Sequence, residues 1–152
     1  MTKPRNFIFG LIVLLIIVNV GFLLFSSDDL DRMNRVNGFM SEAFAAQNAG
    51  NYADAIQDFT RALNLAGEDK RIYYNRGVAY FLDDQSDAAR ADLNQAVALD
   101  ANYALPYLVL GDLEAAAGNA QLAQAHYERY RTLIDDDPDA LATVDARLEA
   151  LP

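Results

Sequence analysis

Lys70 to Tyr103 reads KRIYYNRGVAYFLDDQSDAARADLNQAVALDANY, and this stretch decides the fold. In its first part, Tyr73 and Gly77 are spaced to share one face of a helix. After the polar break DDQ, Ala89 and Leu93 share one face of a second helix. The stretch therefore predicts two short amphipathic helices joined by a tight turn. Neither helix can bury its apolar face alone, so the unit needs neighbours of the same kind.

The same pattern recurs 34 residues before and 34 residues after this stretch. A large ring near the start of the first helix fills the gap between helices, and a small residue four positions later lets the second helix come close. An alanine of the second helix lies at the crossing point, where a larger side chain would push the pair apart. The matched sets are Tyr73, Tyr107 and Phe39; Gly77, Gly111 and Ala43; Ala89, Ala123 and Ala55; Leu93, Tyr127 and Phe59; and Ala96 and Ala62.

This pattern resembles the tetratricopeptide repeat family. The stretch YYNRGVAY is similar to the usual first helix of that family, and NYADAIQDFTRALNL, Asn51 to Leu65, is similar to its second helix. The resemblance covers three repeats, at 36–69, 70–103 and 104–137. It implies an all-α fold, a right-handed superhelix of three helix-turn-helix repeats, which binds a protein partner rather than catalysing a reaction.

The turns inside the repeats rest on residues that tolerate a left-handed backbone. Gly50 fills this role in the first repeat and Gly118 in the third, while Asp84 replaces the glycine in the second and is expected to carry some strain. Asn51 is expected to cap the helix that follows Gly50.

A final helix is predicted over 138–152, with Asp137 as its cap and Pro138 in its first turn. It would cover the exposed end of the stack. Its apolar side would consist of Leu141, Val144 and Leu148.

Composition narrows the chemistry. The chain has 152 residues, no cysteine and a formal net charge of −10. Without cysteine there are no disulfides and no thiolate metal sites, and an acidic chain repels nucleic-acid phosphates. His126 is the only histidine, it is expected on the outside of a helix, and no catalytic constellation surrounds it. The aspartates before Pro138 lack the spacing of a calcium loop. We therefore expect no enzyme, no cofactor, no metal and no nucleic acid.

The N-terminal region predicts a membrane anchor. After the basic tail 1–6, the segment 7–25 reads FIFGLIVLLIIVNVGFLLF, which is uncharged and about 28 Å long as a helix. A cleaved signal peptide would have a shorter apolar region and a small-residue cleavage site, which is missing. Residues 26–35 form an acidic connector. Asn19 is the only amide in the span, and it is a candidate for contact with another transmembrane helix.

Basic residues on both sides of the span bear on its orientation. Lys3 and Arg5 lie within a few residues of the span and favour a cytoplasmic N-terminus, although Arg32 and Arg35 lie beyond its other end. We expect a single-pass protein of the inner (cell) membrane with its repeats in the periplasm. The alternative is an anchored protein that faces the cytosol on an organelle.

The resemblance also implies a concave groove, lined by the first helix of each repeat. It would hold a peptide or a helix of a membrane or membrane-proximal protein, on a central apolar strip. Arg71 is the only basic side chain at these positions, so a basic clamp for a terminal carboxylate is not expected. The implied groove residues are Asn37, Met40, Phe44, Gln47, Arg71, Tyr74, Asn75, Val78, Phe81, Leu105, Leu108, Asp112 and Ala115.

These observations predict a membrane-anchored adaptor or scaffold that mediates protein–protein interactions at the membrane surface. One alternative is a permanently bound accessory or assembly subunit of a membrane protein complex. A more distant alternative is an enzyme or a small-ligand-binding domain. A flanking helix that already covers part of the groove would leave less of it for a partner.

Overall fold

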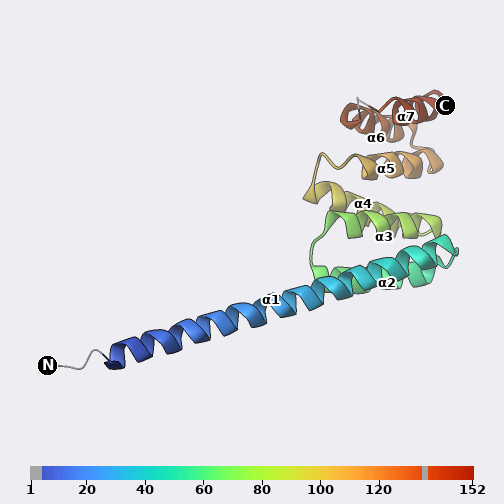
Figure 1. Ribbon diagram of the computed structural model, residues 1–152. Coiled ribbons are helices and arrows are strands. Elements are labelled where there is room, and N and C mark those ends of the chain that lie inside the picture. Colours follow the sequence, from blue (N-terminus) through green and yellow to red (C-terminus); the bar gives the residue numbers. More distant parts are fainter. Residues whose placement is uncertain (1–4, 135–136) are drawn as a thin grey trace. The chain divides into compact units, whose positions relative to one another are not determined.

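The computed structural model describes the backbone of residues 5–134 and 137–152, and within these ranges the side chains from residue 27 onward. The described residues form an all-α chain that divides into two compact units, 1–35 and 36–152. In the second unit, successive helices lie side by side in a stack (Figure 1). The helices are α1 (Arg5–Asn48), α2 (Tyr52–Ala66), α3 (Lys70–Leu82), α4 (Ser86–Leu99), α5 (Ala104–Ala116), α6 (Ala120–Leu133) and α7 (Pro138–Glu149).

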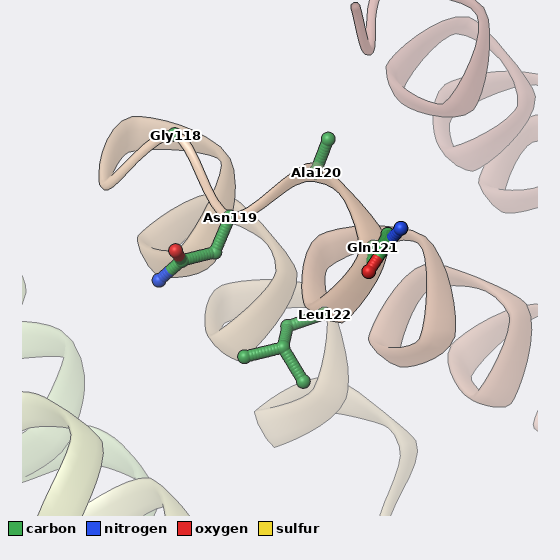
Figure 2. Close-up of a pocket in the computed structure, with 5 residues that line it drawn as sticks. All are labelled: Gly118, Asn119, Ala120, Gln121 and Leu122. Atoms are coloured by element: carbon green, nitrogen blue, oxygen red, sulfur yellow. The ribbon is translucent and has the colours of Figure 1, made fainter.

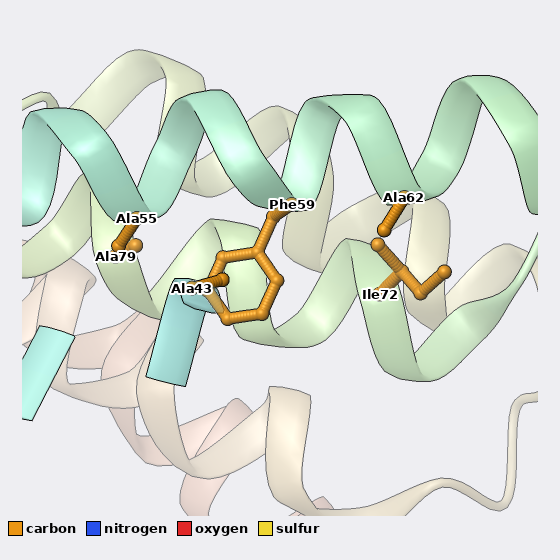
Figure 3. Close-up of a cluster of buried hydrophobic side chains, with 6 residues drawn as sticks. All are labelled: Ala43, Ala55, Phe59, Ala62, Ile72 and Ala79. Atoms are coloured by element: carbon orange, nitrogen blue, oxygen red, sulfur yellow. The ribbon is translucent and has the colours of Figure 1, made fainter. Parts of the chain in front are cut away.

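The core of the first repeat lies where α1, α2 and α3 meet. The ring of Phe59 is fully buried in one cluster with small residues of the neighbouring helices, and it lies beside Ala43 (Figure 3). Phe44 meets this ring edge-on, with 5.4 Å between the ring centroids. Ala55 and Ala62 are also fully buried, as the period of the sequence predicts.

The same contact recurs in the next two repeats. A Cβ atom placed on Gly77 would lie 3.0 Å from Cγ of Leu93, and one placed on Gly111 would lie 2.3 Å from Cε1 of Tyr127. Both glycines are therefore positions of close helix approach, as the sequence predicts. Ala89 and Ala123 are fully buried, which confirms their expected place in the core.

A polar cluster joins α2, α3 and α4 beside this core. The Arg76 guanidinium donates to both carboxylate oxygens of Asp92, at 2.6 and 2.9 Å, and to the hydroxyl of Thr60 at 3.1 Å. The guanidinium carbon also lies 5.8 Å from the ring centroids of Tyr73 and of Tyr80. Because both charged side chains are largely buried, this pair holds α3 against α4 within the second repeat. The hydrogen bond to Thr60 joins this repeat to the first.

The three turns inside the repeats share one backbone form. Gly50 and Gly118 each have a φ of 79°, and Asp84 has a φ of 58°, so the predicted left-handed aspartate is confirmed. Asn51 occupies the N-cap position of α2, but its side chain makes no capping hydrogen bond. Its ψ of 67° departs from the extended backbone from which a cap side chain reaches the helix, which corrects the prediction.

The terminal helix α7 begins as predicted. The carboxylate of Asp137 accepts hydrogen bonds from the backbone N–H groups of Asp139 and Ala140, and Pro138 occupies the first turn. Val144 is fully buried against α6, and Leu148 packs against the same cluster. The apolar side of α7 therefore covers the last repeat.

The predicted location in a membrane is contradicted. Among the residues that the structure describes, no helix combines the length and the apolar character needed to cross a bilayer. The helices α2 to α7 have 12 to 15 residues, whereas about 20 are needed for the hydrocarbon core. The described side chains of α1 include Asp28, Asp29, Asp31 and Arg32. The side chains of 7–25, including Asn19, lie outside the described residues.

Candidate partner-binding groove

A cavity of about 340 Å³ opens between α1 and α3 in the second unit. Five of the predicted groove residues line it together: Asn37, Met40, Phe44, Arg71 and Asn75. Its remaining lining residues are Val36, Asp69 and Ile72. We call this cavity, with these eight residues, the α1/α3 cavity.

Apolar side chains of α1 provide much of the α1/α3 cavity. Phe44 is 39% exposed, which is high for a phenylalanine that also packs on the core, and Met40 is half-buried. Ile72 is almost fully buried and forms apolar lining from the side of α3. An apolar side chain of a partner would thus find apolar contacts from two helices.

Two carboxamides add hydrogen-bonding groups to this apolar lining. Asn75 donates from its side-chain nitrogen to the backbone carbonyl of Arg71 at 2.7 Å, which fixes the orientation of its amide group. Asn37 is exposed on α1. Carboxamides can both donate to and accept from a peptide backbone, and they carry no charge.

An ion pair lies at the start of α3. The carboxylate of Asp69 accepts from the backbone N–H of Arg71 at 2.8 Å and from its guanidinium at 2.9 and 3.3 Å. The hydrogen bond from the Arg71 side chain lowers the pKa of Asp69, and the same bond raises the pKa of Arg71. The basic side chain at the predicted groove positions is therefore already engaged by a carboxylate.

Two tyrosines, Tyr74 on α3 and Tyr103 at the start of α5, contact each other. Tyr74 meets Tyr103 edge-on, with 5.4 Å between ring centroids. Burial raises the pKa of Tyr74, and burial beside Tyr74 raises the pKa of Tyr103 to about 12. Both phenols therefore stay neutral at physiological pH.

Tyr74 and Phe81 are predicted groove residues that are not among the residues lining the α1/α3 cavity. Both are half-buried and pack against the core cluster that contains Leu93 and Leu110. The sequence could not reveal this packing role, because the expected groove face and the packing face overlap on α3. Val78 is half-buried on the same helix.

The third repeat offers little of the predicted groove. Leu108 and Ala115 pack into the cluster that includes α7, and Asp112 accepts from Tyr127 at 2.8 Å and from Arg147 at 2.7 Å. These residues thus contact α6 and α7 of the same chain and are less available to a partner. Leu105 remains 42% exposed.

Gln47 neither lines the α1/α3 cavity nor packs in the cluster of the third repeat. Its side-chain oxygen is buried without a hydrogen-bond partner in the described part of the chain.

Sequence reasoning missed Asp69 and Tyr103, although a signal for both was present. Each is the N-cap residue of the first helix of a repeat, and they are separated by the same period as the helices they precede. Reading the cap positions with the same period would have placed both at the starts of helices that are predicted to line the groove.

The prediction that His126 lies on the outside of its helix is wrong. It is half-buried beside the ring of Tyr107, with 6.3 Å between centroids, and burial lowers its pKa. A neutral imidazole in such a position is a packing group.

A second hollow lies at the turn between α5 and α6. It is lined by the successive residues 118–122, and the side chains of Asn119, Ala120 and Leu122 point in different directions (Figure 2). Without converging groups it lacks the character of a binding site. Within 5–134 and 137–152, no cluster of acidic residues and histidine is arranged to hold a metal ion.

The comparisons with known proteins agree with this architecture. Residues 70–103 match the model of the tetratricopeptide repeat family. RNA polymerase II-associated protein 3 of Xenopus laevis is 32% identical over 81 residues, which are 53% of this chain and 12% of the relative. The chain thus spans about an eighth of the length of this curated relative. The family model and the structural neighbours together support a relationship to the tetratricopeptide repeat family.

Two solved structures of similar fold carry a bound peptide. The type III secretion chaperone SycD of Yersinia enterocolitica, in complex with a peptide of the translocator YopD, has a TM-score of 0.72 and 22% identity. The alignment covers 78% of this chain and 92% of SycD. The first repeat domain of Spaghetti (RPAP3), bound to the HSP90 peptide SRMEEVD, has a TM-score of 0.68 and 24% identity, with 78% and 94% covered. These likenesses concern the fold.

Proposed function

We propose that this chain is a protein-interaction module, an adaptor or scaffold that binds a segment of a partner protein in the α1/α3 cavity. The observation that carries the proposal is the convergence of five predicted groove residues on one cavity. Apolar side chains of two helices and two carboxamides suit a peptide with a bulky apolar anchor.

The solved neighbours add support of a general kind. SycD and the Spaghetti domain are both described with a bound peptide, on a fold that this chain shares. The covered third repeat suggests that the partner segment contacts the first two repeats and not the whole stack.

Selection from a random peptide library displayed on phage tests the proposal. The full-length chain is the bait, and enriched peptides are resynthesised and titrated calorimetrically against Phe44→Ala and Asn75→Ala. Each variant should weaken binding by about 1–2 kcal/mol or more if its side chain is an anchor. Leu99→Ala is the matched control, because Leu99 is 37% exposed and lies on α4, outside the cavity.

Circular dichroism melting of each variant separates loss of binding from loss of fold. Enriched peptides that bind Phe44→Ala and Asn75→Ala as tightly as the unchanged protein would show that the working surface lies elsewhere.

A further inference from the structure

We propose that the α1/α3 cavity selects a segment in which a bulky apolar residue is flanked by basic residues, and disfavours acidic segments. This inference rests on the proposed function and specifies the chemistry of the partner. Two independent observations carry it: the apolar lining of the cavity and the arrangement of charge around it.

The apolar lining sets the anchor. Met40, Phe44 and Ile72 come from two helices that face each other across the cavity. A leucine-sized side chain placed there loses contact with water on several sides, whereas an alanine leaves much of the space unfilled. The anchor should therefore be leucine, methionine or phenylalanine.

The charge pattern of the domain sets the flanks. The chain has 22 acidic and 12 basic residues, so its field favours cations. Most basic side chains of the second unit are already paired with carboxylates inside the molecule. The paired ones are Arg61, Lys70, Arg71, Arg76, Arg90, Arg131 and Arg147.

The ion pair at the cavity, between Asp69 and Arg71, also favours a basic flank. The carboxylate of Asp69 is fixed, because it caps α3 through the backbone N–H of Arg71, and it is only 25% exposed. The Arg71 side chain is 72% exposed, and its aliphatic part is flexible. A basic flank can therefore approach a fixed carboxylate by displacing a loosely held guanidinium. An acidic flank would have to compete with Asp69 for that guanidinium.

Three acetylated and amidated Gly/Ser nonapeptides test the flanks, with Lys-Leu-Lys, Gln-Leu-Gln or Glu-Leu-Glu at the centre. A fourth peptide, with Lys-Ala-Lys, tests the anchor. Each is titrated into the isotopically labelled full-length chain and followed by NMR. At about 0.01 M salt, where charges act over about 30 Å, affinity should fall from Lys to Gln to Glu, with about tenfold between the extremes. The alanine peptide should bind about tenfold more weakly than its leucine counterpart.

Variants locate the charge effect. Asp69→Asn keeps a good capping residue but removes the charge, and it should reduce the preference for lysine over glutamate by at least about half. Arg71→Gln should raise the affinity for the lysine peptide. Asp87→Asn is the control, since it removes an equal charge from a fully exposed position on α4, and it should reduce the preference less than Asp69→Asn does.

The possible failures are distinguishable. Equal affinity for the lysine and glutamate peptides, or tighter binding of the glutamate peptide, overturns this inference. If library peptides of another character bind and lose affinity on Phe44→Ala, the proposed function stands and only the charge preference is wrong. If no peptide binds in the cavity, both fail.

Discussion

Gly111 lies so close to Tyr127 that a methyl group at position 111 would fall 2.3 Å from the tyrosine ring. The ring cannot easily yield, because the hydroxyl of Tyr127 donates to Asp112 at 2.8 Å and the side chain is almost fully buried. At the equivalent place in the second repeat, Gly77 faces the more flexible side chain of Leu93, with 3.0 Å to its Cγ.

This difference predicts graded effects of adding one methyl group. Gly111→Ala should lower the free energy of unfolding by about 1–3 kcal/mol, and Gly77→Ala should have a smaller effect. Gly38→Ala provides the control, since nothing lies within 4 Å of a Cβ atom there, and it should stabilise the helix by about 0.5–1 kcal/mol. Urea unfolding measures all three. Equal losses at positions 111 and 77 would contradict the assigned rigidity of the ring.

Breaking the ion pair between Arg76 and Asp92 should destabilise the chain strongly. The two side chains are only 15% and 10% exposed, so Asp92→Ala leaves a cation without its partner and should cost about 3 kcal/mol. The matched control is Asp145→Ala, which breaks a pair with Arg131 whose side chains are 45% and 53% exposed. That change should stay within about 0.5 kcal/mol. Similar values for both variants, from thermal unfolding, would refute the ranking.

Glu114 predicts a defined acid dependence of stability. Hydrogen bonds from Asn119 and then from Arg90 lower its pKa below the ordinary value of 4.5. A carboxyl group whose pKa is lower in the folded state contributes stability above pH 4.5, and that contribution disappears as the pH falls through the folded pKa. Glu114→Gln should therefore destabilise at pH 7, and the gap to the unchanged protein should shrink below pH 4.5.

The measurement is the urea midpoint of both proteins between neutral and acidic pH. A gap that stays constant below pH 4.5 would show that Glu114 acts through packing and not through its charge.

The strained turn of the second repeat can be relieved. Asp84 has a φ of 58°, which costs an L-amino acid more than a glycine, so Asp84→Gly should stabilise by roughly 0.5 kcal/mol after allowing for the greater freedom of glycine in the unfolded chain. The reverse exchange is Gly50→Ala, where φ is 79°, and it should destabilise by about 1 kcal/mol or more. Thermal melts of both variants give the signs. A lower midpoint for Asp84→Gly would mean that the aspartate side chain supports the turn.

Much of the fold could be predicted because its determinants are local and repeated. The 34-residue period placed Ala89, Gly77 and Phe59 in the core without any knowledge of distant contacts. The cap Asp137 was predictable for the same reason, since it acts within its own turn. Side-chain pairs between two helices were harder, and the pair of Arg76 on α3 with Asp92 on α4 was not foreseen.

The groove was predicted less completely, for a physical reason. Position along a helix says which face a side chain lies on, but not what covers that face. Asp112 lies at a predicted groove position, yet Arg147 of the terminal helix neutralises it. Arg71 lines the α1/α3 cavity, while the carboxylate that engages it lies just outside the helix on which the periodicity was read.

Tyr130 stands where the two earlier repeats carry Ala62 and Ala96, and its ring packs in one cluster with Val144 of α7. This replacement makes the junctions of the stack unequal for the insertion of a duplicated repeat. A tandem copy of 70–103 would bring its own alanine to each new junction and fit the unit that follows. A copy placed after 104–137 would meet a tyrosine ring where the other junctions have only a methyl group. A duplicated repeat should therefore be better tolerated within the series than directly after 104–137.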